Sequence, residues 1–505
     1  MSLLSENALF LWDWRWLTTA LVFLLSYHVV RFYRKVFQHP KGPFPLPLVG
    51  NLLSFRSETP LYRRAEEWSR TYGDPFTLWM GEKPMVMLNS YEVTKEALVD
   101  KRHEFAGRSS TKFGEMRLQG SHDIVFEDYN PTWKALRKLA LTAARKYAVS
   151  DSLQSLCTEV VDAYVDSLEQ GPNTVDSKEP FMFIFFNIIG TSVFGTKFEK
   201  DGPELARIKQ LKQAIANVAP NGLPSDIVPW LGILYRKREN MTRNLFTEFL
   251  QLLNGLYQRA VESYVPGSAQ NFTHSMLAAR EEALEQEKSD AQYLTEANMV
   301  QVLLDIFGAA NDTSIGELQW LCLTMTRKPD IQARIQQEIE GCLGKTPPTM
   351  HDRDKLPYTV ACLYETLRFY PVAPMGLPHK TSCDTEAGGK FVPKGTGLFY
   401  NIYGVNHDPT LWKDPDVFRP ERFLDSVTGK LNLEGMPALL TFGMGPRTCP
   451  GEKLAHMDMF YVLVRLMQRL SCSALVGKSS TDIKRHGSNL FLFPAVQDIV
   501  LTRRH

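Results

Sequence analysis

Residues 442–455 read FGMGPRTCPGEKLA, which places Cys449 between a glycine- and proline-rich turn and a helix. The turn residues exclude regular structure before Cys449, whereas apolar residues from Leu454 onward recur at helical spacing and predict a helix over 452–470. Cys449 is therefore expected at a helix N-terminus, where unpaired amide N–H groups and the helix dipole favour an anion. Such a site lowers the pKa of a thiol and favours the metal-binding thiolate.

A buried structural cysteine in a helix-capping loop is the simpler interpretation of a lone thiol. The complete pattern Phe442-x-x-Gly445-x-Arg447-x-Cys449-x-Gly451 resembles the haem-binding loop of the cytochrome P450 family. The resemblance implies that Cys449 is the axial ligand of the iron in haem b (iron protoporphyrin IX), with Phe442 and Arg447 beside the haem. Because a thiolate ligand pushes electron density onto iron and favours O–O cleavage, it also implies oxygen activation.

The composition is that of an ordinary globular chain. Of 505 residues, 44% are hydrophobic and 22% charged, and a net charge of +1 argues against a nucleic-acid-binding protein. Length alone suggests about three domains. Because no linker, repeat or low-complexity block follows residue 50, we predict one large catalytic domain instead. Seven cysteines without paired spacing favour a reducing compartment and one special thiol.

The N-terminus is typical of a membrane anchor. Residues 8–30 are mostly apolar, and the basic residues within 31–35 place the following chain in the cytosol by the positive-inside rule. Asp13 and Arg15 shorten the apolar run relative to the roughly 20 residues that a bilayer needs. A cleaved signal peptide is the alternative, but the acidic start and the lack of a small-residue cleavage site favour a signal anchor over residues 1–35.

A stiff segment follows the anchor. Four prolines and the pair Gly50-Asn51 predict a hinge over residues 36–51, which leaves 52–505 for the haem-thiolate monooxygenase domain. The hinge resembles that of membrane-bound members of the family. This likeness implies a single-pass protein of the endoplasmic reticulum membrane whose catalytic domain faces the cytosol.

Residues 300–323 predict a long helix that carries the stretch GAANDTS at 308–314. A hydroxyl at Thr313 and a carboxylate at Asp312 suit a proton relay, whereas a back-bonded threonine in a helix contact is the structural alternative. The stretch resembles the oxygen-activating motif of the family, which implies that Thr313 and Asp312 are catalytic. It departs from that motif at Ala310, where glycine is usual, and we expect the oxygen groove to be narrower there.

Three further residues are candidates for holding the haem propionates. Trp133 and Arg137 follow a helix start signal and stand four residues apart, so they share one helix face. A stacking pair on the helix surface is the alternative. The resemblance implies that both residues contact a propionate, since a buried carboxylate needs a cation. His379 matches a family position near a propionate.

Glu365 and Arg368 form the Glu-x-x-Arg motif on a helix that starts near residue 357. Neighbours at this spacing usually form a weak surface ion pair, but the surrounding apolar residues indicate burial, where an unpaired charge is untenable. The resemblance implies a third partner from 418–423, such as Arg422. We expect these residues to be structural rather than catalytic.

Two apolar regions complete the sequence. Residues 181–194 are apolar on nearly every face, which predicts a buried helix. Residues 214–265 contain three prolines between apolar segments and predict two helices with a mobile connection, arranged as a lid over a buried pocket. Within this lid, residues 230–234 either touch lipid or form a packing patch.

The motifs span residues 40–470 and imply the mainly α cytochrome P450 fold with a small β-rich lobe, preceded by one transmembrane helix. Within the family the chain resembles the animal microsomal branch of steroid hydroxylases and xenobiotic oxidases. This implies a monooxygenase that inserts one oxygen atom from O2 into a lipophilic small molecule, either steroid-like or another hydrophobic compound.

The sequence contains no dinucleotide-binding fingerprint and no flavin domain, so electrons must come from a partner. The resemblance implies NADPH–cytochrome P450 reductase as that partner and cytochrome b5 as a further donor. A haem-thiolate isomerase or dehydratase that needs no reductase is one alternative, which the acid–alcohol pair at 312–313 disfavours. A non-catalytic haem sensor is the other.

Overall fold

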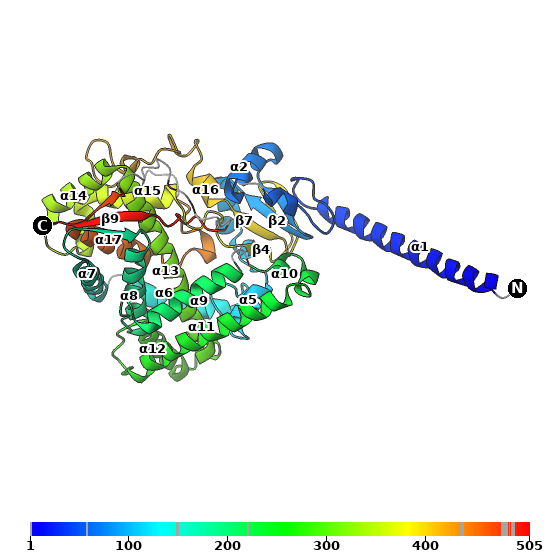
Figure 1. Ribbon diagram of the computed structural model, residues 1–505, viewed down its shortest axis with the longest axis horizontal. Coiled ribbons are helices and arrows are strands. Elements are labelled where there is room, and N and C mark those ends of the chain that lie inside the picture. Colours follow the sequence, from blue (N-terminus) through cyan, green and yellow to red (C-terminus); the bar gives the residue numbers. More distant parts are fainter. Residues whose placement is uncertain are drawn as a thin grey trace.

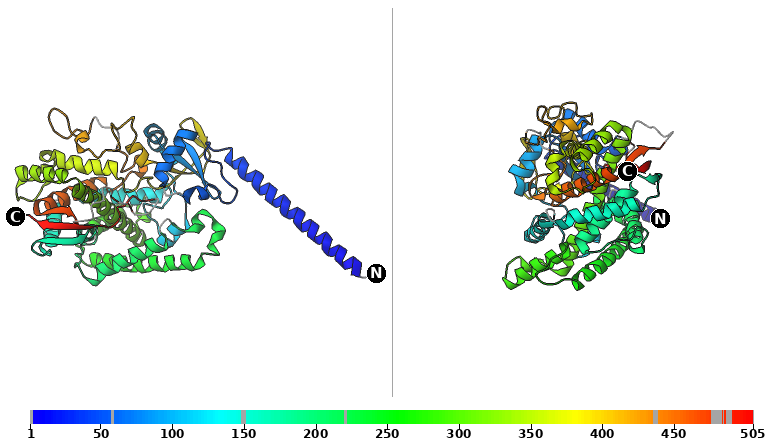
Figure 2. Two further views of the ribbon diagram at one scale, coloured as in Figure 1. Left: turned by 45° about the horizontal axis from the view of Figure 1, so that its top comes forward. Right: turned by 90° about the vertical axis from the view of Figure 1, so that its left-hand side faces the viewer.

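The computed structural model describes residues 3–56, 59–147, 151–219, 222–434, 439–475, 483, 485 and 490–504. A helical body carries one long N-terminal helix that projects from it (Figure 1 and the left view of Figure 2). The helices are α1 (Leu3–Val36), α2 (Leu61–Tyr72), α3 (Tyr91–Lys95), α4 (Arg102–Phe105), α5 (Lys112–Leu118), α6 (Pro131–Tyr147), α7 (Asp151–Asp166), α8 (Glu179–Phe194), α9 (Pro203–Val218), α10 (Pro224–Ile227), α11 (Arg236–Glu262), α12 (Phe272–Glu285), α13 (Glu296–Arg327), α14 (Pro329–Leu343), α15 (Pro357–Phe369), α16 (Ile402–Asn406) and α17 (Glu452–Arg469). The strands are β1 (Phe76–Met80), β2 (Lys83–Leu88), β3 (Pro172–Asp176), β4 (His379–Lys380), β5 (Thr385–Ala387), β6 (Lys390–Val392), β7 (Gly397–Tyr400), β8 (Leu470–Ala474) and β9 (Asp498–Arg503).

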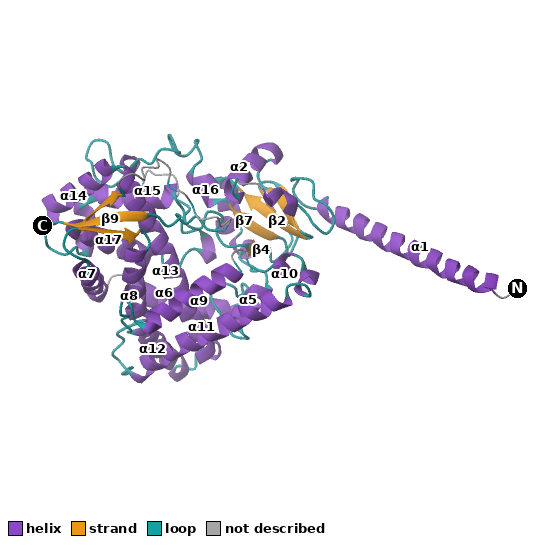
Figure 3. Ribbon diagram, in the orientation of Figure 1, coloured by secondary structure: helices purple, strands orange, loops and turns teal. Residues whose placement is uncertain are grey.

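The strands form small sheets at separate places on the body. One sheet has the order β1-β2-β7-β4, with β2 and β7 parallel, and it lies next to α1 (Figure 3). A second sheet has the order β3-β9-β8 and lies near the C-terminus, and β5 pairs with β6. β1 and β2 pair antiparallel, and Pro84 lies within β2 opposite Trp79.

Helix α13 runs through the centre of the body (Figure 1) and packs against α8, α14, α15 and α17. It begins where the Thr295 side chain accepts a hydrogen bond from the N–H of Asn298, and it ends just before Pro329. The helix expected over 300–323 is thus confirmed and is longer at both ends.

The all-round apolar segment over 181–194 is confirmed as the buried helix α8. Its Phe186 and Phe194 rings lie 5.8 and 5.7 Å from the ring of Phe307 on α13. Burying each such ring stabilises the fold by about 1.5–3 kcal/mol. This contact therefore holds α13 in place against α8.

The two helices expected over 214–265 are present, but the first begins well before that range, at Pro203. α9 ends at Val218 and α11 begins at Arg236, and between them lie α10 and a 3-10 turn over Pro229–Gly232. Residues 220 and 221 of this connection lie outside the described residues. The carboxylate of Asp226 accepts a hydrogen bond from the N–H of Lys112 (2.6 Å), which ties the connection to α5.

The end of α1 is docked onto the body. Residues 14–36 are long and apolar enough to cross a membrane, and only 6% of their most apolar window is buried. Phe32, in contrast, is buried, and its ring lies 5.2 Å from that of Trp79 on β1. The side chain of Asn51 accepts from the N–H of Trp79 (2.8 Å) and donates to the carbonyl of Pro43 (3.1 Å), so the proline-rich segment is held on the sheet edge.

Candidate active site

Cys449 lies in a closed loop directly before α17. Its N–H donates to the carbonyl oxygen of Phe442 (2.8 Å), which joins the two ends of the loop. Gly443 and Gly445 have φ values of +70° and +72°, in the region that favours glycine. A side chain at Gly445 would also overlap the carbonyl oxygen of Leu98. The cysteine loop can therefore pack against the helical turn over 96–100 only with glycine at position 445.

The electrostatics of the thiol combine opposing effects. Burial raises the pKa of Cys449, whereas the N–H groups of Gly451 and Glu452 and the charge of Arg137 lower it. The amide groups lower the pKa, as predicted, but the effect of desolvation is larger than theirs. The prediction of a lowered pKa is therefore wrong for the protein chain without a bound metal. Coordination of a metal cation is what favours a thiolate in such a buried site.

Helix α13 has an accessible stretch in the middle of an otherwise buried course. Residues 298–305 and 314–326 are buried, whereas Gly308, Ala309 and Ala310 retain accessible surface. A Cβ built on Gly308 meets no heavy atom within 4 Å. This small-residue surface is the kind that a planar group can approach closely.

Thr313 and Asp312 lie on this stretch with different partners. The Thr313 hydroxyl donates to the carbonyl oxygen of Ala309 (2.8 Å), the back-bonded geometry of the structural alternative. The Asp312 carboxylate forms an ion pair with the ammonium group of Lys212 on α9 (2.8 Å), and its side chain is 47% exposed. Their catalytic roles stay a prediction.

Arginine side chains from three segments gather near the cysteine loop. Burial and the positive charges of Arg108 and Arg137 lower the pKa of Arg447 to about 9, and burial lowers that of Arg108 to about 10. The guanidinium carbons of Arg447 and Arg137 lie 4.0 and 5.3 Å from the centre of the Trp133 ring. The shared face predicted for Trp133 and Arg137 is therefore confirmed.

The side-chain hydrogen bonds of Arg108 and Arg447 in this cluster go to backbone carbonyl oxygens. Arg447 donates to the carbonyl of Ala106 (3.0 Å), and such bonds satisfy N–H groups without cancelling charge. The nearby carboxylates of Asp123 and Asp128 are already paired with Arg117 and Lys380. A buried dianion, as the propionates of a haem provide, fits this arrangement.

His379 borders the same cluster. Its Nδ1 lies 2.8 Å from the carbonyl oxygen of Phe105, which can only accept, so Nδ1 donates there. Burial and the charges of Arg108 and Arg447 lower the pKa of His379 well below its usual range. The ring is therefore neutral, and Nε2 becomes a donor only when a nearby anion favours a second proton.

The Glu365–Arg368 pair is buried and structural, as predicted. The Glu365 carboxylate binds the guanidinium of Arg368 (2.8 Å) and that of Arg422 (3.0 Å), and all three side chains are at most 6% exposed. Arg368 also donates to the carbonyl of Asn406 (2.8 Å), whose amide donates to the hydroxyl of Thr441 (3.0 Å). This chain of contacts links α15 to the segment that enters the cysteine loop.

The sequence analysis missed Arg108, Asn406 and Thr441. Arg108 follows a glycine in an irregular segment, and its donation to the carbonyl of Pro378 (2.5 Å) crosses 270 positions of the chain. The only signal in the sequence was a lone arginine before a region with no regular pattern. Asn406 and Thr441 carry no local pattern at all, because their contacts exist only in the folded chain.

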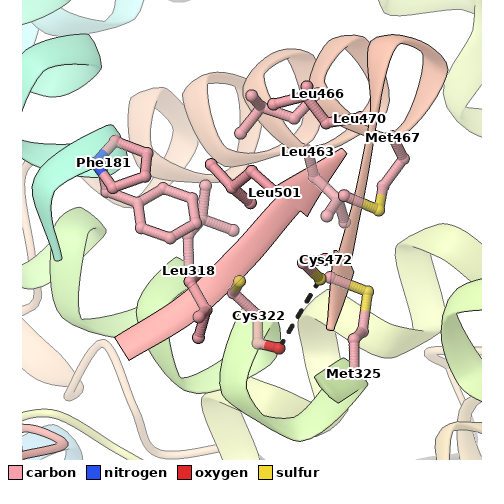
Figure 4. Close-up of a pocket in the computed structure, with 12 residues that line it drawn as sticks. Phe181, Leu318, Cys322, Met325, Leu463, Leu466, Met467, Leu470, Cys472 and Leu501 are labelled. Atoms are coloured by element: carbon pink, nitrogen blue, oxygen red, sulfur yellow. Dashed lines mark hydrogen bonds between the residues drawn. The ribbon is translucent and has the colours of Figure 1, made fainter. Parts of the chain in front are cut away.

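A small apolar cavity of about 20 Å³ lies between α8, α13, α17 and the β8–β9 pair (Figure 4). The Cys472 thiol points toward the carbonyl oxygen of Cys322 across it (4.0 Å). A space of this size is about that of one water molecule. None of the predicted site residues lines the cavity, so it is a packing feature rather than the active site.

The cysteine loop, the small-residue stretch of α13 and the arginine cluster together define a haem-thiolate protein. The family model for cytochrome P450 matches residues 40–501. A steroid 17-alpha-hydroxylase/17,20 lyase from Squalus acanthias is 31% identical over 447 residues, 88% of this chain and 88% of the relative. Cytochrome P450 1B1 from Mus musculus is 31% identical over 481 residues (91% and 87%). Cytochrome P450 2K6 from Danio rerio is 32% identical over 449 residues (87% and 86%).

The chain belongs to the cytochrome P450 family. The resemblance stated from its motifs is thereby confirmed, as is the mainly α fold with small sheets. It is a monooxygenase whose cofactor is a haem iron. Its apolar N-terminal helix fits membrane anchoring.

Proposed function

We propose that this protein is a membrane-anchored monooxygenase of lipophilic small molecules, supplied with electrons by NADPH–cytochrome P450 reductase. The balanced reaction is R–H + O2 + NADPH + H⁺ → R–OH + H2O + NADP⁺. The observation that carries this proposal is the combination of Cys449 at the start of α17 with an accessible acid–alcohol pair on α13. Cytochrome b5 is proposed as a second electron donor.

The residues of the chain have separable tasks in this reaction. Cys449 would bind the iron of haem b through its thiolate, and Phe442 would close the cysteine loop beside it. The propionates would be held by Arg108, Arg137, Arg447, Trp133 and His379. The bound haem supplies electron transfer and oxygen activation. The Thr313 hydroxyl and the Asp312 carboxylate would move protons from solvent toward the site of oxygen activation.

The substrate class is proposed from two features. One relative is named for a steroid, and this supports a steroid-like or similarly hydrophobic substrate. The described surface of α13 next to Thr313 consists of small, mostly apolar residues, which suit an apolar molecule over the haem.

The membrane arrangement is proposed as single-pass, in the endoplasmic reticulum, with the domain over 52–505 in the cytosol. The anchor is residues 1–35 and the hinge is 36–51. Basic residues at Arg31, Arg34 and Lys35 support this orientation, because they follow the apolar run directly. A lipophilic substrate dissolved in the bilayer would then be concentrated next to the protein.

The test uses the full-length protein, loaded with haem and reconstituted with the reductase in phospholipid vesicles. The thiolate-type spectrum of the reduced carbon monoxide adduct is expected, together with NADPH-dependent hydroxylation of compounds from a steroid and xenobiotic panel. Turnover without NADPH or reductase would indicate an isomerase or dehydratase. Substrate-induced spectral shifts without any product from the panel would favour a haem sensor.

A further inference from the structure

Glu317 is a buried carboxyl group to which the proposed mechanism assigns no role. It lies on α13, four residues after Thr313, and is 3% exposed. Its Oε1 accepts a hydrogen bond from the N–H of Val372 (3.2 Å), whereas Oε2 is buried with no partner among the described residues. Burial raises the pKa of Glu317 well above its usual range, so the group is a neutral acid with one O–H to donate.

The Thr313 hydroxyl has the complementary requirement. Its hydrogen is directed at the carbonyl oxygen of Ala309 (2.8 Å), which leaves the hydroxyl oxygen as an acceptor. Residues four apart on a helix lie on one face with Cβ atoms about 5–6 Å apart. The structure shows no hydrogen bond between the two side chains, but at that spacing a rotation of the Glu317 carboxyl group brings Oε2 within reach of the hydroxyl, directly or through one water, since each such bond spans about 2.8 Å.

Asp312, the other acid of this stretch, is held elsewhere. Its carboxylate pairs with Lys212 on α9 and is half-exposed, so it is directed toward the lid helix and solvent. The neutral acid that lies on the same face as Thr313 and within the core is Glu317.

The loops packed beside Glu317 limit the positions that its side chain can take. The Val372 carbonyl accepts from the N–H of Leu492 (2.9 Å), and the Leu492 carbonyl accepts from the indole of Trp320 on α13 (2.8 Å). A side chain at Gly316 would clash with the ring of Phe493 at 2.7 Å. These contacts clamp two loops onto α13 beside Glu317, which restricts the directions in which its second oxygen can point.

We propose that Glu317 is a positioning residue for Thr313: its carboxyl group turns so that its O–H donates toward the Thr313 hydroxyl oxygen, directly or through one water. This contact orients the hydroxyl for proton delivery. The inference rests on the proposed function, because it assumes that Thr313 serves oxygen activation. It adds a residue outside the acid–alcohol pair to the machinery that couples NADPH use to product.

The test compares Glu317→Met, which keeps the length and removes the donor, with Glu317→Gln, which keeps an N–H donor. In the full-length, reductase-supported enzyme, Met should lower the ratio of product to NADPH by about 3- to 10-fold, the effect of one hydrogen bond. Hydrogen peroxide should rise in proportion. Gln should stay within about 2-fold of the unsubstituted enzyme, because the donor remains.

A double-mutant cycle separates positioning from packing. In a Thr313→Ala background Glu317→Met should cause no further loss, because its target is gone. A Met variant with unchanged coupling, a Gln variant as impaired as Met, or equal losses in both backgrounds would overturn the proposal. An enzyme that shows no reductase-supported turnover before any substitution would refute the proposed function itself, and that outcome is visible in the starting protein.

An infrared measurement covers the case in which Glu317→Met does not fold. The carbonyl stretching band of the neutral Glu317 acid, assigned by its loss in Glu317→Gln, should shift in Thr313→Ala. The buried Asp458 on α17, whose pKa burial also raises, provides a second acid band that should not move. A Glu317 band that is identical with and without the Thr313 hydroxyl contradicts the contact.

Discussion

At the scale of single residues, the strongest constraint is the identity of residue 449. Cys449→His replaces a thiolate donor with a neutral imidazole, which gives iron less electron density. We expect the reduced carbon monoxide adduct to lose its thiolate-type Soret band and turnover to vanish. Cys383→Ser, at an exposed thiol, is the control and should change neither. An unaltered spectrum in the histidine variant would remove Cys449 as the ligand.

Thr313 offers a second prediction at this scale. Thr313→Ala should retain haem and substrate binding, continue to consume NADPH, and release hydrogen peroxide in place of product. The loss of product per NADPH should be roughly 10²-fold at most, because water partly replaces a positioned proton donor. Thr313→Ser should restore most of it, since it restores the hydroxyl. Wild-type coupling in the alanine variant would make this threonine a helix-packing residue.

Ala310→Gly tests the departure from the family motif in the same assay. Removing the methyl group of Ala310 extends the open space over α13 that already exists at the Cβ position of Gly308. We expect the ratio of product to NADPH to stay equal or rise. A fall in that ratio would mean that the methyl group of Ala310 itself supports the productive arrangement.

The residues that sequence reasoning identified are those whose chemistry needs a contiguous pattern. Cys449, with its glycines, and Trp133, four residues from Arg137, meet their neighbours through local geometry alone. Arg108, Asn406 and Glu317 act across segments far apart in the chain, so no local pattern identifies them. The prediction of a lowered pKa for Cys449 was wrong for a related reason, because desolvation depends on every atom that the fold packs around the sulfur.

At the scale of elements, the buried network between α15 and the cysteine loop predicts a large loss of stability. Glu365→Ala would leave the guanidinium groups of Arg368 and Arg422 buried without their carboxylate. We expect a loss of about 3–5 kcal/mol in the free energy of unfolding, with impaired haem retention. Thermal and denaturant unfolding of the loaded protein measure it.

The matched control is Glu159→Ala, which removes an ion pair with Lys197 in which both side chains are more than half exposed. Exposed pairs contribute about 0–1 kcal/mol, so this variant should unfold like the parent. Equal losses in the two variants would contradict the view that burial makes the Glu365 network important.

The helices that the sequence predicted have either an amphipathic pattern, as over 452–470, or an apolar run of helical length, as over 181–194. The division of the strands into separate sheets was not predictable, since pairing such as that of β3 with β9 joins positions more than 300 residues apart. The lid connection was recognised from its prolines, but its tie to α5 through Asp226 depends on the fold.

At the scale of the whole molecule, membrane binding should have two components. Deleting residues 1–35 should leave haem binding intact and weaken membrane association without abolishing it. Trp230, Ile233 and Leu234 are 57%, 82% and 72% exposed, an apolar surface of the kind that inserts into the headgroup region. Vesicle flotation of the truncated protein measures the remainder.

Serine at those three positions should release the truncated protein from vesicles. Val427→Ser, at another exposed apolar residue, is the control and should have no effect. A truncated protein that is fully soluble before these substitutions would assign all membrane binding to α1.

The packing of Phe32 on Trp79 holds the end of α1 rigidly against the body, so α1 is not a flexible attachment. The carbonyl of Ile227 and the side chain of Val228 both lie 3.3 Å from a Cβ built on Gly81, so the segment leading to Trp230 starts beside the β1–β2 turn, at the end of the body from which α1 emerges (Figure 2). If the exposed residues near Trp230 also bind lipid, two attachments at one end would hold the body at a fixed tilt over the bilayer. The proposed reductase, confined to the same membrane, would then search for the electron-accepting face in two dimensions, and only contacts around the rim that stands clear of the lipid would be productive.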